Sequence, residues 1–453
     1  MSVYEFTFSR DYYEWLQKAI EEQDAKSIKL SMEEANTADV ASMLDEFGTD
    51  ESKFVIANLD KEFASEVISH IEEDTRRNFI KTFEPEEVAQ YVDCMDSDDA
   101  ADLLNDVPVK FGEKVIGALE NEEKASYILE LMRYEEDCAG ALMAKELIKA
   151  NVNWTVVQTI DEIRRQKEDV EKIYSVYVVD DKNTLLGRVS LKKIILANDN
   201  TRIADLYESE LMRVETVMDS EEVATIMQKY DLEAVPVVNV KGKLVGRITI
   251  DDVIDLITEM AEQERQMMAG ISEDVEEDDN IWLLTRARLP WLVIGLVGGL
   301  IGARFIGLFE EDIALIPAMA FFIPLITATG GNVGIQSSSI VVQTLASEPS
   351  LSGSWLRRLF KGAVVAIING LVLSLLVFAF NYLLMDNNQI AIVVSIALFS
   401  VVLLASFMGT VTPLILDKIG INPALASGPF ITTANDLIGL AVYFSVARML
   451  YVL

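Results

Sequence analysis

The sequence predicts a multidomain protein with an all-α superhelical repeat domain, an α/β module built from a tandem repeat, and an α-helical transmembrane domain of five spans. Helical segments with acidic starts recur between residues 35 and 130, a β-rich unit repeats at a constant offset of 59, and five long apolar stretches follow residue 280. The net charge of −35 divides in the same way, because residues 281–453 carry +1 and residues 1–280 carry −36. We therefore expect an acidic soluble half joined to a membrane half.

The composition limits the partners and the chemistry. A strongly acidic surface repels phosphates, so nucleic acid is not an expected partner. Two cysteines, Cys94 and Cys138, and one histidine, His70, imply no disulfide framework and fit a reducing cytoplasm. With so few thiolate and imidazole ligands, a bound metal should be a hard cation such as Mg²⁺, Ca²⁺ or Mn²⁺, which prefers oxygen. The N-terminus lacks the charge pattern of a signal peptide, so we expect it to stay inside.

Residues 1–34 predict an N-terminal helix or extension, and residues 35–140 predict a domain of repeated short helices. Alanines mark the repeat at spacings of 23, 25, 12 and 24 residues: Ala41, Ala64, Ala89, Ala101 and Ala125. Such a helix cannot bury its apolar face alone, so the helices should stack into a small superhelix. Asp98, Asp99 and Asp102 crowd one helix start. They are either cap and dipole partners or metal ligands across a domain interface.

Residues 141–257 contain a second, sharper repeat. VVDDKNTLLGRVSLKKII at 178–195 matches VVNVKGKLVGRITIDDVI at 237–254 without gaps. The pair resembles tandem CBS motifs, which fold together as one α/β module and often bind adenine nucleotides through Gly-x-x-Ser/Thr-x-x-Asp. The second copy has all three residues of this motif: Gly246, Thr249 and Asp252. Lys193 replaces the acid in the first copy, so the resemblance implies at most one site for ATP or another adenine nucleotide.

Residues 253–280 are expected to form an acidic connecting helix and linker. Acids recur three or four residues apart at Asp252, Asp255, Glu259 and Glu262, a spacing at which like charges destabilise an isolated helix. One interpretation is a solvated linker face. The other is a helix whose acids are neutralised by bridging cations, so that its position depends on the ion concentration.

Residues 281–453 predict five membrane spans, at about 289–308, 313–345, 360–384, 390–415 and 428–450. The second is too long for a plain span, and we expect Pro317, Pro324 and the Gly330-Gly331 pair to break it beside protein or a water-filled cavity. Basic residues favour a cell (inner) membrane protein with a cytoplasmic N-terminus and an external C-terminus. In this orientation Arg304 and Arg448 lie near the outer ends of the spans, and the outer loops hold Glu310, Glu311, Asp312 and Asp386.

Asp436 lies within the last span, the apolar stretch from Ala426 to Leu450. It is about ten residues in, roughly 15 Å along a helix, and therefore near the bilayer midplane. A carboxylate at this depth is unfavourable in lipid, so it usually faces a polar cavity or a partner and indicates an ion path. The alternative is a static packing role, with Asp436 hydrogen-bonded to Asn435 or to another helix.

Three stretches together resemble the MgtE family of Mg²⁺ channels. They are RYEEDCAGALM at 133–143, TATGGNVGIQSSS at 327–339 and NPALASGPFITTANDLIGL at 422–440. The order of helical repeat, CBS pair, acidic helix and five spans is also similar, and the resemblance covers roughly residues 35–453.

The resemblance implies a homodimer with an ion pore on its twofold axis, between the second and fifth spans. Asp436 matches the pore carboxylate of the family, and Thr432 matches a position that turns backbone oxygen toward the hydrated ion. Gly428 stands where other members have Asn. Three residues match the signature of the second span and are expected to shape the opposite wall: Gly330, Gly331 and Asn332.

Residues 253–270 match the plug helix of the family, whose closed state is held by Mg²⁺ between acidic faces. The candidate ligands for regulatory Mg²⁺ are Asp98, Asp99, Asp102, Asp252, Asp255, Glu259 and Glu262. The implied function is Mg²⁺ influx down the electrochemical gradient, closed by cytosolic Mg²⁺ and serving magnesium homeostasis. No ATP hydrolysis is needed, and the protein is not expected to be an enzyme.

Other functions remain open at this point. The chain could be a CBS-regulated divalent cation transporter of broader specificity, passing Mn²⁺ or Co²⁺, or a Mg²⁺ sensor that does not conduct. An anion channel would need helix N-termini or basic residues at depth, which Asp436 opposes. An intramembrane enzyme would need a motif such as HExxH, a P-loop or Gly-x-Ser-x-Gly, and the sequence contains none of the three. A secondary transporter usually shows repeats among its spans, whereas these five spans are dissimilar.

Overall fold

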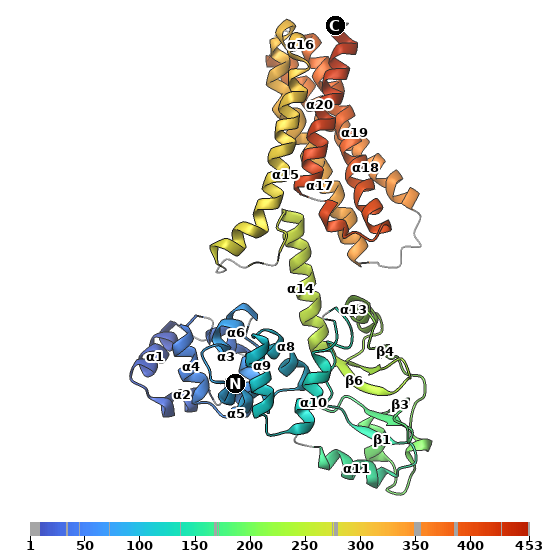
Figure 1. Cartoon of the computed structure of the whole chain (residues 1–453). Coiled ribbons are helices and arrows are strands. Elements are labelled where there is room, and N and C mark those ends of the chain that lie inside the picture. Colours follow the sequence, from blue (N-terminus) through green and yellow to red (C-terminus); the bar gives the residue numbers. More distant parts are fainter. Residues whose placement is uncertain are drawn as a thin grey trace. The chain divides into compact units, whose positions relative to one another are not determined.

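The computed structural model forms two compact units, residues 1–257 and residues 258–453 (Figure 1). It describes residues 10–32, 35–44, 46–71, 73–135, 137–166, 170, 172–273, 275, 280–347, 355–384, 388–426 and 428–451.

The first part of unit 1 is an array of short helices. These are α1 (Arg10–Glu21), α2 (Ala25–Met32), α3 (Thr37–Leu44), α4 (Thr49–Ala57), α5 (Lys61–Ser69), α6 (Glu73–Ile80), α7 (Pro85–Val92), α8 (Ser97–Asn105), α9 (Val109–Ala118) and α10 (Glu122–Leu131). Alternate helices pack on one another, as α3 on α5, α5 on α7 and α7 on α9. Ala41, Ala64, Ala89 and Ala101 are buried between them, whereas Ala125 keeps some exposure. The predicted stacking of a helical repeat is confirmed.

The rest of unit 1 is the α/β module, with two three-stranded sheets of the same topology. Its elements are β1 (Lys149–Asn151), α11 (Val156–Arg165), β2 (Val176–Val179), β3 (Leu185–Val189), α12 (Leu191–Leu196), η1 (Ile203–Asp205), β4 (Val214–Glu215), α13 (Ser220–Lys229), β5 (Ala234–Val238), β6 (Leu244–Thr249) and the first residues of α14 (Ile250–Ala269), whose part from residue 258 belongs to unit 2. In both sheets the first pair of strands is parallel and the second antiparallel. Val178 pairs with Gly187 as Val237 pairs with Gly246, so the sequence repeat is also a repeat of register.

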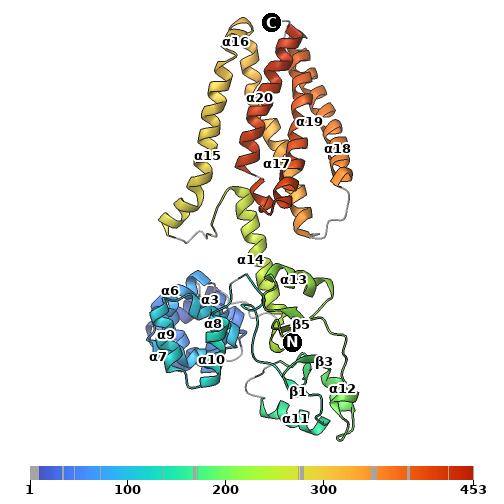
Figure 2. The same cartoon turned by 45° about the vertical axis from the view of Figure 1, so that its right-hand side comes forward.

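Unit 2 is a helical bundle. After the end of α14 it contains α15 (Ile281–Gly307), α16 (Glu310–Leu315), η2 (Pro317–Phe322), α17 (Ile323–Ser347), α18 (Trp355–Leu384), α19 (Asn388–Lys418), η3 (Pro423–Ala426) and α20 (Pro429–Tyr451). α19 lies centrally and packs against α17, α18 and α20, while α15 packs on α20 (Figure 2). Among the described residues, five helical segments are long and apolar enough to cross a membrane: Ile281–Gly307, Pro317–Leu345, Leu356–Leu383, Asn388–Lys418 and Pro423–Tyr451.

The predicted break of the second span is wrong at the glycine pair. α17 runs without interruption through Pro324, Gly330 and Gly331, and the chain departs from α-helix earlier, in the 3₁₀ segment that begins at Pro317. Pro324 lies in the first turn of α17, where its missing N–H would have no partner in any case. The glycines serve close packing instead of unwinding.

Candidate functional site

The centre of unit 2 is a close contact between α17 and α20. A Cβ added to Gly331 would lie 3.1 Å from Cγ2 of Thr432 and 3.7 Å from Oδ1 of Asp436. A Cβ added to Gly334, one turn further along α17, would collide with the side chain of Asn435. Small residues on α17 therefore allow α20 to approach until Asp436 lies beside Gly331.

Asp436 is half-buried in this contact. It has no hydrogen bond to Asn435, because neither amide atom of the buried Asn435 has a partner among the residues that the structure describes. The static packing role in which Asp436 is hydrogen-bonded to Asn435 is therefore not observed.

Some of the other predicted pore residues lie close to Asp436, and others do not. Thr432 lies one turn before it, and the Thr432 hydroxyl donates to the carbonyl of Gly428 at 2.9 Å. Gly428 has a φ of +63°, and a Cβ there would meet the carbonyl of Met268, so an Asn at this position would be strained. Gly330 packs on Val401 of α19, while Asn332 is exposed on α17. The structure therefore brings Gly331, Thr432 and Asp436 together, and it does not bring Asn332 into their contact.

Unit 1 holds a second group of acids, at the start of α8 and the start of α14. Asp98 is only 9% exposed. Burial, followed by the charges of Asp252 and Asp99, raises the pKa of Asp98 well above its usual range. Burial and then the charge of Glu146 raise the pKa of Asp96 to about 6. Burial and then the charge of Asp252 raise the pKa of Asp99 to about 7. Carboxylates from the helical domain and the α/β module therefore repel one another here.

The bonds around Asp252 compensate this repulsion only in part. Burial raises the pKa of Asp252, while the N–H and hydroxyl of Thr249, which donate to its Oδ2 at 3.0 and 2.6 Å, lower it. Arg247 is buried, and its Nη2 lies 3.7 Å from Oδ2 of Asp96. The charges of Arg247 and Lys124 near Asp96, and of Arg76 near Asp99, do not offset burial and repulsion, so an excess of negative charge remains that protons or a hard cation would relieve.

The remaining predicted regulatory acids lie at the edge of this group or outside it. Asp102 is exposed on α8, and its charge helps to raise the pKa of Asp99. Burial raises the pKa of Asp255, and the charge of His70 lowers it. Glu259 and Glu262 belong to unit 2, so their link to the acids of α8 stays a prediction. Over the described ranges, no three acidic, Cys or His side chains are grouped closely enough to hold a metal ion.

The predicted nucleotide motif differs between the two copies. In the first, Nζ of Lys193 donates to Glu208 at 2.8 Å and to the carbonyl of Leu206 at 3.3 Å, so an amine occupies the place of the carboxylate. In the second, the side chains of Thr249 and Asp252 are close enough to hydrogen-bond to each other. A Cβ at Gly246 would lie 2.7 Å from the carbonyl of Ala144, so this glycine is required by packing. Of the two copies, the second has both the hydroxyl and the carboxylate of the predicted nucleotide motif, and its binding of a nucleotide stays a prediction.

Family descriptions match most of the chain. "MgtE intracellular N domain" covers residues 35–137, "CBS domain" covers 139–199 and 203–259, and "Divalent cation transporter" covers 323–446. The magnesium transporter MgtE of Thermus thermophilus is 33% identical over 96% of this chain and 97% of its own length. The chain belongs to the MgtE family. The magnesium transporter MgtE of Bacillus subtilis is 29% identical over 93% of this chain and 96% of its own.

Two solved structures resemble the soluble half of this MgtE-family chain. The soluble part of a magnesium transporter is 29% identical, with a TM-score of 0.51 over 55% of this chain and 98% of its own. The cytosolic domain of the Mg²⁺ channel MgtE in complex with ATP is 34% identical, with a TM-score of 0.51 over 53% of this chain and 98% of its own. The expected fold class, with helical domain, CBS pair and five apolar helices, is confirmed.

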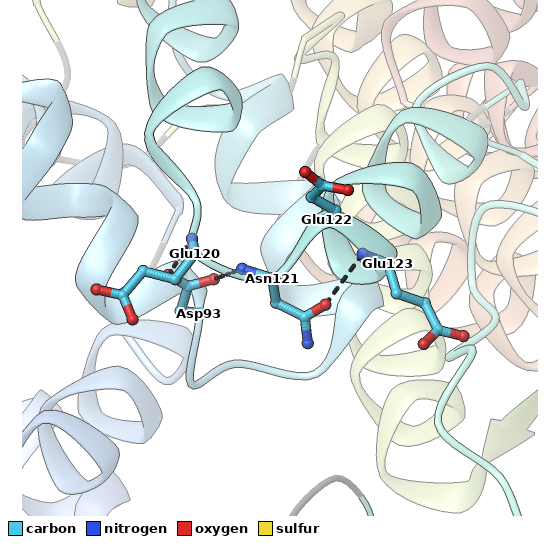
Figure 3. Close-up of a pocket in the computed structure, with 5 residues that line it drawn as sticks. All are labelled: Asp93, Glu120, Asn121, Glu122 and Glu123. Carbon is cyan, nitrogen blue, oxygen red and sulfur yellow. Dashed lines mark hydrogen bonds between the residues drawn. The ribbon is translucent and has the colours of Figure 1, made fainter.

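A surface depression in this MgtE-family chain is also acidic, but its chemistry differs from that of the buried acids. A cavity of about 560 Å³ is lined by Asp93, Glu120, Asn121, Glu122 and Glu123. The carboxylate of Asp93 accepts the N–H groups of Glu120 and Asn121 at 3.0 and 3.4 Å, so it serves to hold the turn. The three glutamate carboxylates point in different directions (Figure 3). This depression is a structured turn with a solvated rim.

Sequence reasoning missed three charged residues around the acids of α8 and α14: Asp96, Glu146 and Arg247. Asp96 directly precedes α8 and has the ordinary pattern of a helix N-cap. Glu146 accepts the N–H and hydroxyl of Ser97 at 3.2 and 2.7 Å, from 49 residues further along the chain. No local pattern predicts a contact at that separation.

Proposed function

We propose that this chain is a Mg²⁺ channel of the cell membrane that admits Mg²⁺ down its electrochemical gradient. The observation that carries the proposal is Asp436, a carboxylate in an apolar helix that packs against the glycine face of α17. The names of the magnesium transporters that are 29–35% identical support Mg²⁺ as the ion. A membrane potential contributes ~2.3 kcal/mol per charge per 100 mV, so a divalent ion gains twice that on entry.

The proposed pore lies on the twofold axis of a homodimer, so that each copy contributes one Asp436. Mg²⁺ loses its water reluctantly and is usually bound with several waters retained. Two carboxylates facing each other across an axis suit such an ion, because they attract it through its hydration shell. A ring of acids is an established way to select cations over anions. In this proposal Asp436 attracts the ion, and the hydroxyl of Thr432 holds the first turn of α20 through its bond to the carbonyl of Gly428. Gly331, which has no side chain, leaves room on α17 for Asp436.

Gating is proposed to depend on the acids that unit 1 groups at the starts of α8 and α14. Asp98, Asp99 and Asp252 repel one another, so an arrangement that brings them together is favoured only when protons or cations neutralise them. Cytosolic Mg²⁺ would stabilise that closed arrangement and shift the population away from the conducting state. This feedback requires the N-terminus to be cytoplasmic, with the C-terminus outside. ATP or another adenine nucleotide would bind the second CBS copy and influence the same acids through Asp252.

Flux of Mg²⁺ into proteoliposomes tests the proposal. Asp436→Asn removes the charge at constant shape, and we expect it to lower Mg²⁺ flux by more than ~10-fold, since losing a buried charge contact exceeds 1.4 kcal/mol. Asp417→Asn is the matched control, because Asp417 is an exposed carboxylate at the end of α19 and its loss should leave flux unchanged.

Two other results would overturn parts of the proposal. Equal flux through the wild type and Asp436→Asn would remove Asp436 from the mechanism. A folded wild type that carries no Mg²⁺ would favour the sensor hypothesis. Competition by Mn²⁺ and Co²⁺ in the same vesicles measures whether selectivity is broad.

A further inference from the structure

The C-terminal end of α20 is held by an ion pair between an exposed arginine and a buried aspartate. Nε of Arg448, on α20, donates to Oδ2 of Asp312, on α16, at 2.7 Å. Asp312 is only 7% exposed, although 136 residues separate the two partners along the chain. A charged hydrogen bond of this length to a buried carboxylate is among the stronger side-chain contacts in proteins.

Aromatic rings extend this contact. The guanidinium of Arg448 lies over the ring of Phe309, 5.0 Å from its centre. Phe309 in turn stacks on Phe444, with ring centres 4.3 Å apart and planes 7° from parallel. Phe444 is fully buried and belongs to α20. We call Phe309, Asp312, Phe444 and Arg448 the C-terminal clamp.

The clamp joins α20 to α16, the short helix that precedes η2 and α17 in the chain. The segment that contains Phe309 and Asp312 continues through η2 directly into α17. The Tyr443 hydroxyl, beside the clamp, donates to the carbonyl of Met319 in η2 at 2.9 Å. Toward the other end of the pair, the Ser338 hydroxyl donates to the carbonyl of Ala426 at 3.4 Å. On one side of the glycine contact, a hydrogen bond joins α20 to η2, and on the other side a hydrogen bond joins α17 to η3.

Asp436 lies between these two connections. It precedes Arg448 by twelve residues, which is ~18 Å along an α-helix. Arg448 is fixed near the end of α20, and Ala426, in the η3 segment that precedes α20, is held by α17, so α20 has little freedom to slide or rotate against α17. The place of the Asp436 carboxylate beside Gly331 follows from that register.

We propose that Asp312 and Arg448 are positioning residues for ion passage, because their ion pair fixes the register of α20 and thereby the place of Asp436. This inference rests on the proposed function of Asp436. Neither residue touches the ion. A carboxylate attracts a hydrated cation best when it is held at one position in the pore wall. If α20 can shift, the position of the Asp436 carboxylate varies, and Mg²⁺ is bound more weakly.

The two partners are unequal, and this makes the clamp testable. The side chain of Arg448 is 53% exposed, whereas that of Asp312 is 10% exposed. Arg448→Gln leaves a buried carboxylate without its cation, which destabilises more than the loss of a surface charge. Asp312→Asn leaves an arginine that can still reach water. The single Arg448→Gln variant should therefore be the more damaged, and adding Asp312→Asn should restore stability.

The experiment uses the full chain with four variants: Arg448→Gln, Asp312→Asn, their combination, and Glu311→Gln as the matched control. Glu311 is exposed on the same short helix, so its loss changes the local charge and leaves the clamp intact. Unfolding temperature in detergent should fall most for Arg448→Gln and recover in the double variant. The half-saturating Mg²⁺ concentration of flux should rise by roughly tenfold in Arg448→Gln, and Arg448→Lys should restore part of it.

Each failure has its own signature. If Glu311→Gln and Arg448→Gln are equally impaired, or the double variant shows no recovery, the clamp is refuted. If Arg448→Gln unfolds earlier but keeps the wild-type half-saturation and maximal flux, the pair is only structural. If the wild type carries no Mg²⁺, the proposed function and the positioning role fall together, while the unfolding temperatures still decide whether the pair forms.

Discussion

Neutral pH should destabilise the soluble unit, because its folded state holds protons that the unfolded chain releases. The pKa of Asp96 rises from 3.8 to about 6 and that of Asp99 from 3.8 to about 7, both chiefly through burial. Below pH 4 both states are protonated, so no difference arises. Between about pH 4 and pH 7 the unfolded chain loses its protons first, and the free energy of unfolding falls as the pH rises. Above pH 7 this contribution is constant.

The magnitude follows from the size of the two shifts. The side chain of Asp96 is 43% exposed and Asp99 also keeps solvent contact, so solvent screening leaves less than half of the full linkage value. We take ~1–2 kcal/mol for each group, or ~2–4 kcal/mol together. For a unit of this size, that corresponds to a fall in unfolding temperature of roughly 5–10 °C.

Thermal unfolding of a fragment covering residues 1–270, followed by circular dichroism, measures this fall in the presence of a chelator. The fragment keeps unit 1 and all of α14, and a soluble part of a related magnesium transporter that matches it has been crystallised. Millimolar Mg²⁺ should raise the unfolding temperature strongly above pH 7 and weakly at pH 5, where protons already neutralise the acids. Asp96→Asn with Asp99→Asn should flatten both dependences. Glu120→Gln with Glu122→Gln, on the exposed rim of the surface depression, should leave them unchanged.

One result would refute this reasoning directly. If the fragment becomes more stable between pH 4 and pH 7 without Mg²⁺, the carboxylates are not repelling one another in the folded state. If both pairs of substitutions flatten the pH dependence equally, the effect comes from the overall charge of the acidic half and not from this group.

Two further predictions concern the glycine contact and the nucleotide motif. Gly334→Ala should destabilise the membrane unit by ~1–3 kcal/mol, because the added Cβ would collide with Asn435. Gly299→Ala should be neutral, because the space around Gly299 is open. The unfolding temperature in detergent distinguishes the two variants, and equal effects would contradict the packing role of Gly334. Thr249→Val should weaken ATP binding to the fragment by ~10-fold, a loss of ~1.4 kcal/mol. Ser190→Ala, at the equivalent position of the first copy, should leave ATP binding unchanged. Calorimetric titration with ATP measures both affinities, and equal losses would show that the first copy also binds ATP.

Patterns repeated along the chain made most of the fold predictable. The constant offset between residues 178–195 and 237–254 predicts two copies of one unit, and the two sheets share even the position of their register shift, at Val178/Val179 and Val237/Val238. Backbone pairing in one copy repeats that in the other, so the pattern survives folding. The alanine repeat of the helical domain works for the same reason, since each helix packs on near neighbours in the sequence.

Glycine shows where local pattern stops being sufficient. Gly330 and Gly331 predict equally an unwound turn or a close helix contact, because both uses exploit the missing Cβ. The choice depends on whether another helix is present at that face, and α20 arrives there from 100 residues further along the chain. Its Thr432 and Asp436 occupy the space, so the helix continues.

Charged residues show the same limit more strongly. From sequence, Asp312 and Arg448 are two charges near the ends of spans, and they only help to orient the chain. Asp96 is an ordinary cap in the same sense. In the structure, Asp312 is buried against Arg448, and Asp96 belongs to a group that includes Glu146 and Asp252. A charge has no periodicity that identifies its partner, and burial multiplies the energy of whichever partner it meets. Charged residues whose partners cannot be predicted from the sequence are therefore the ones whose substitution should tell most about stability and ion passage.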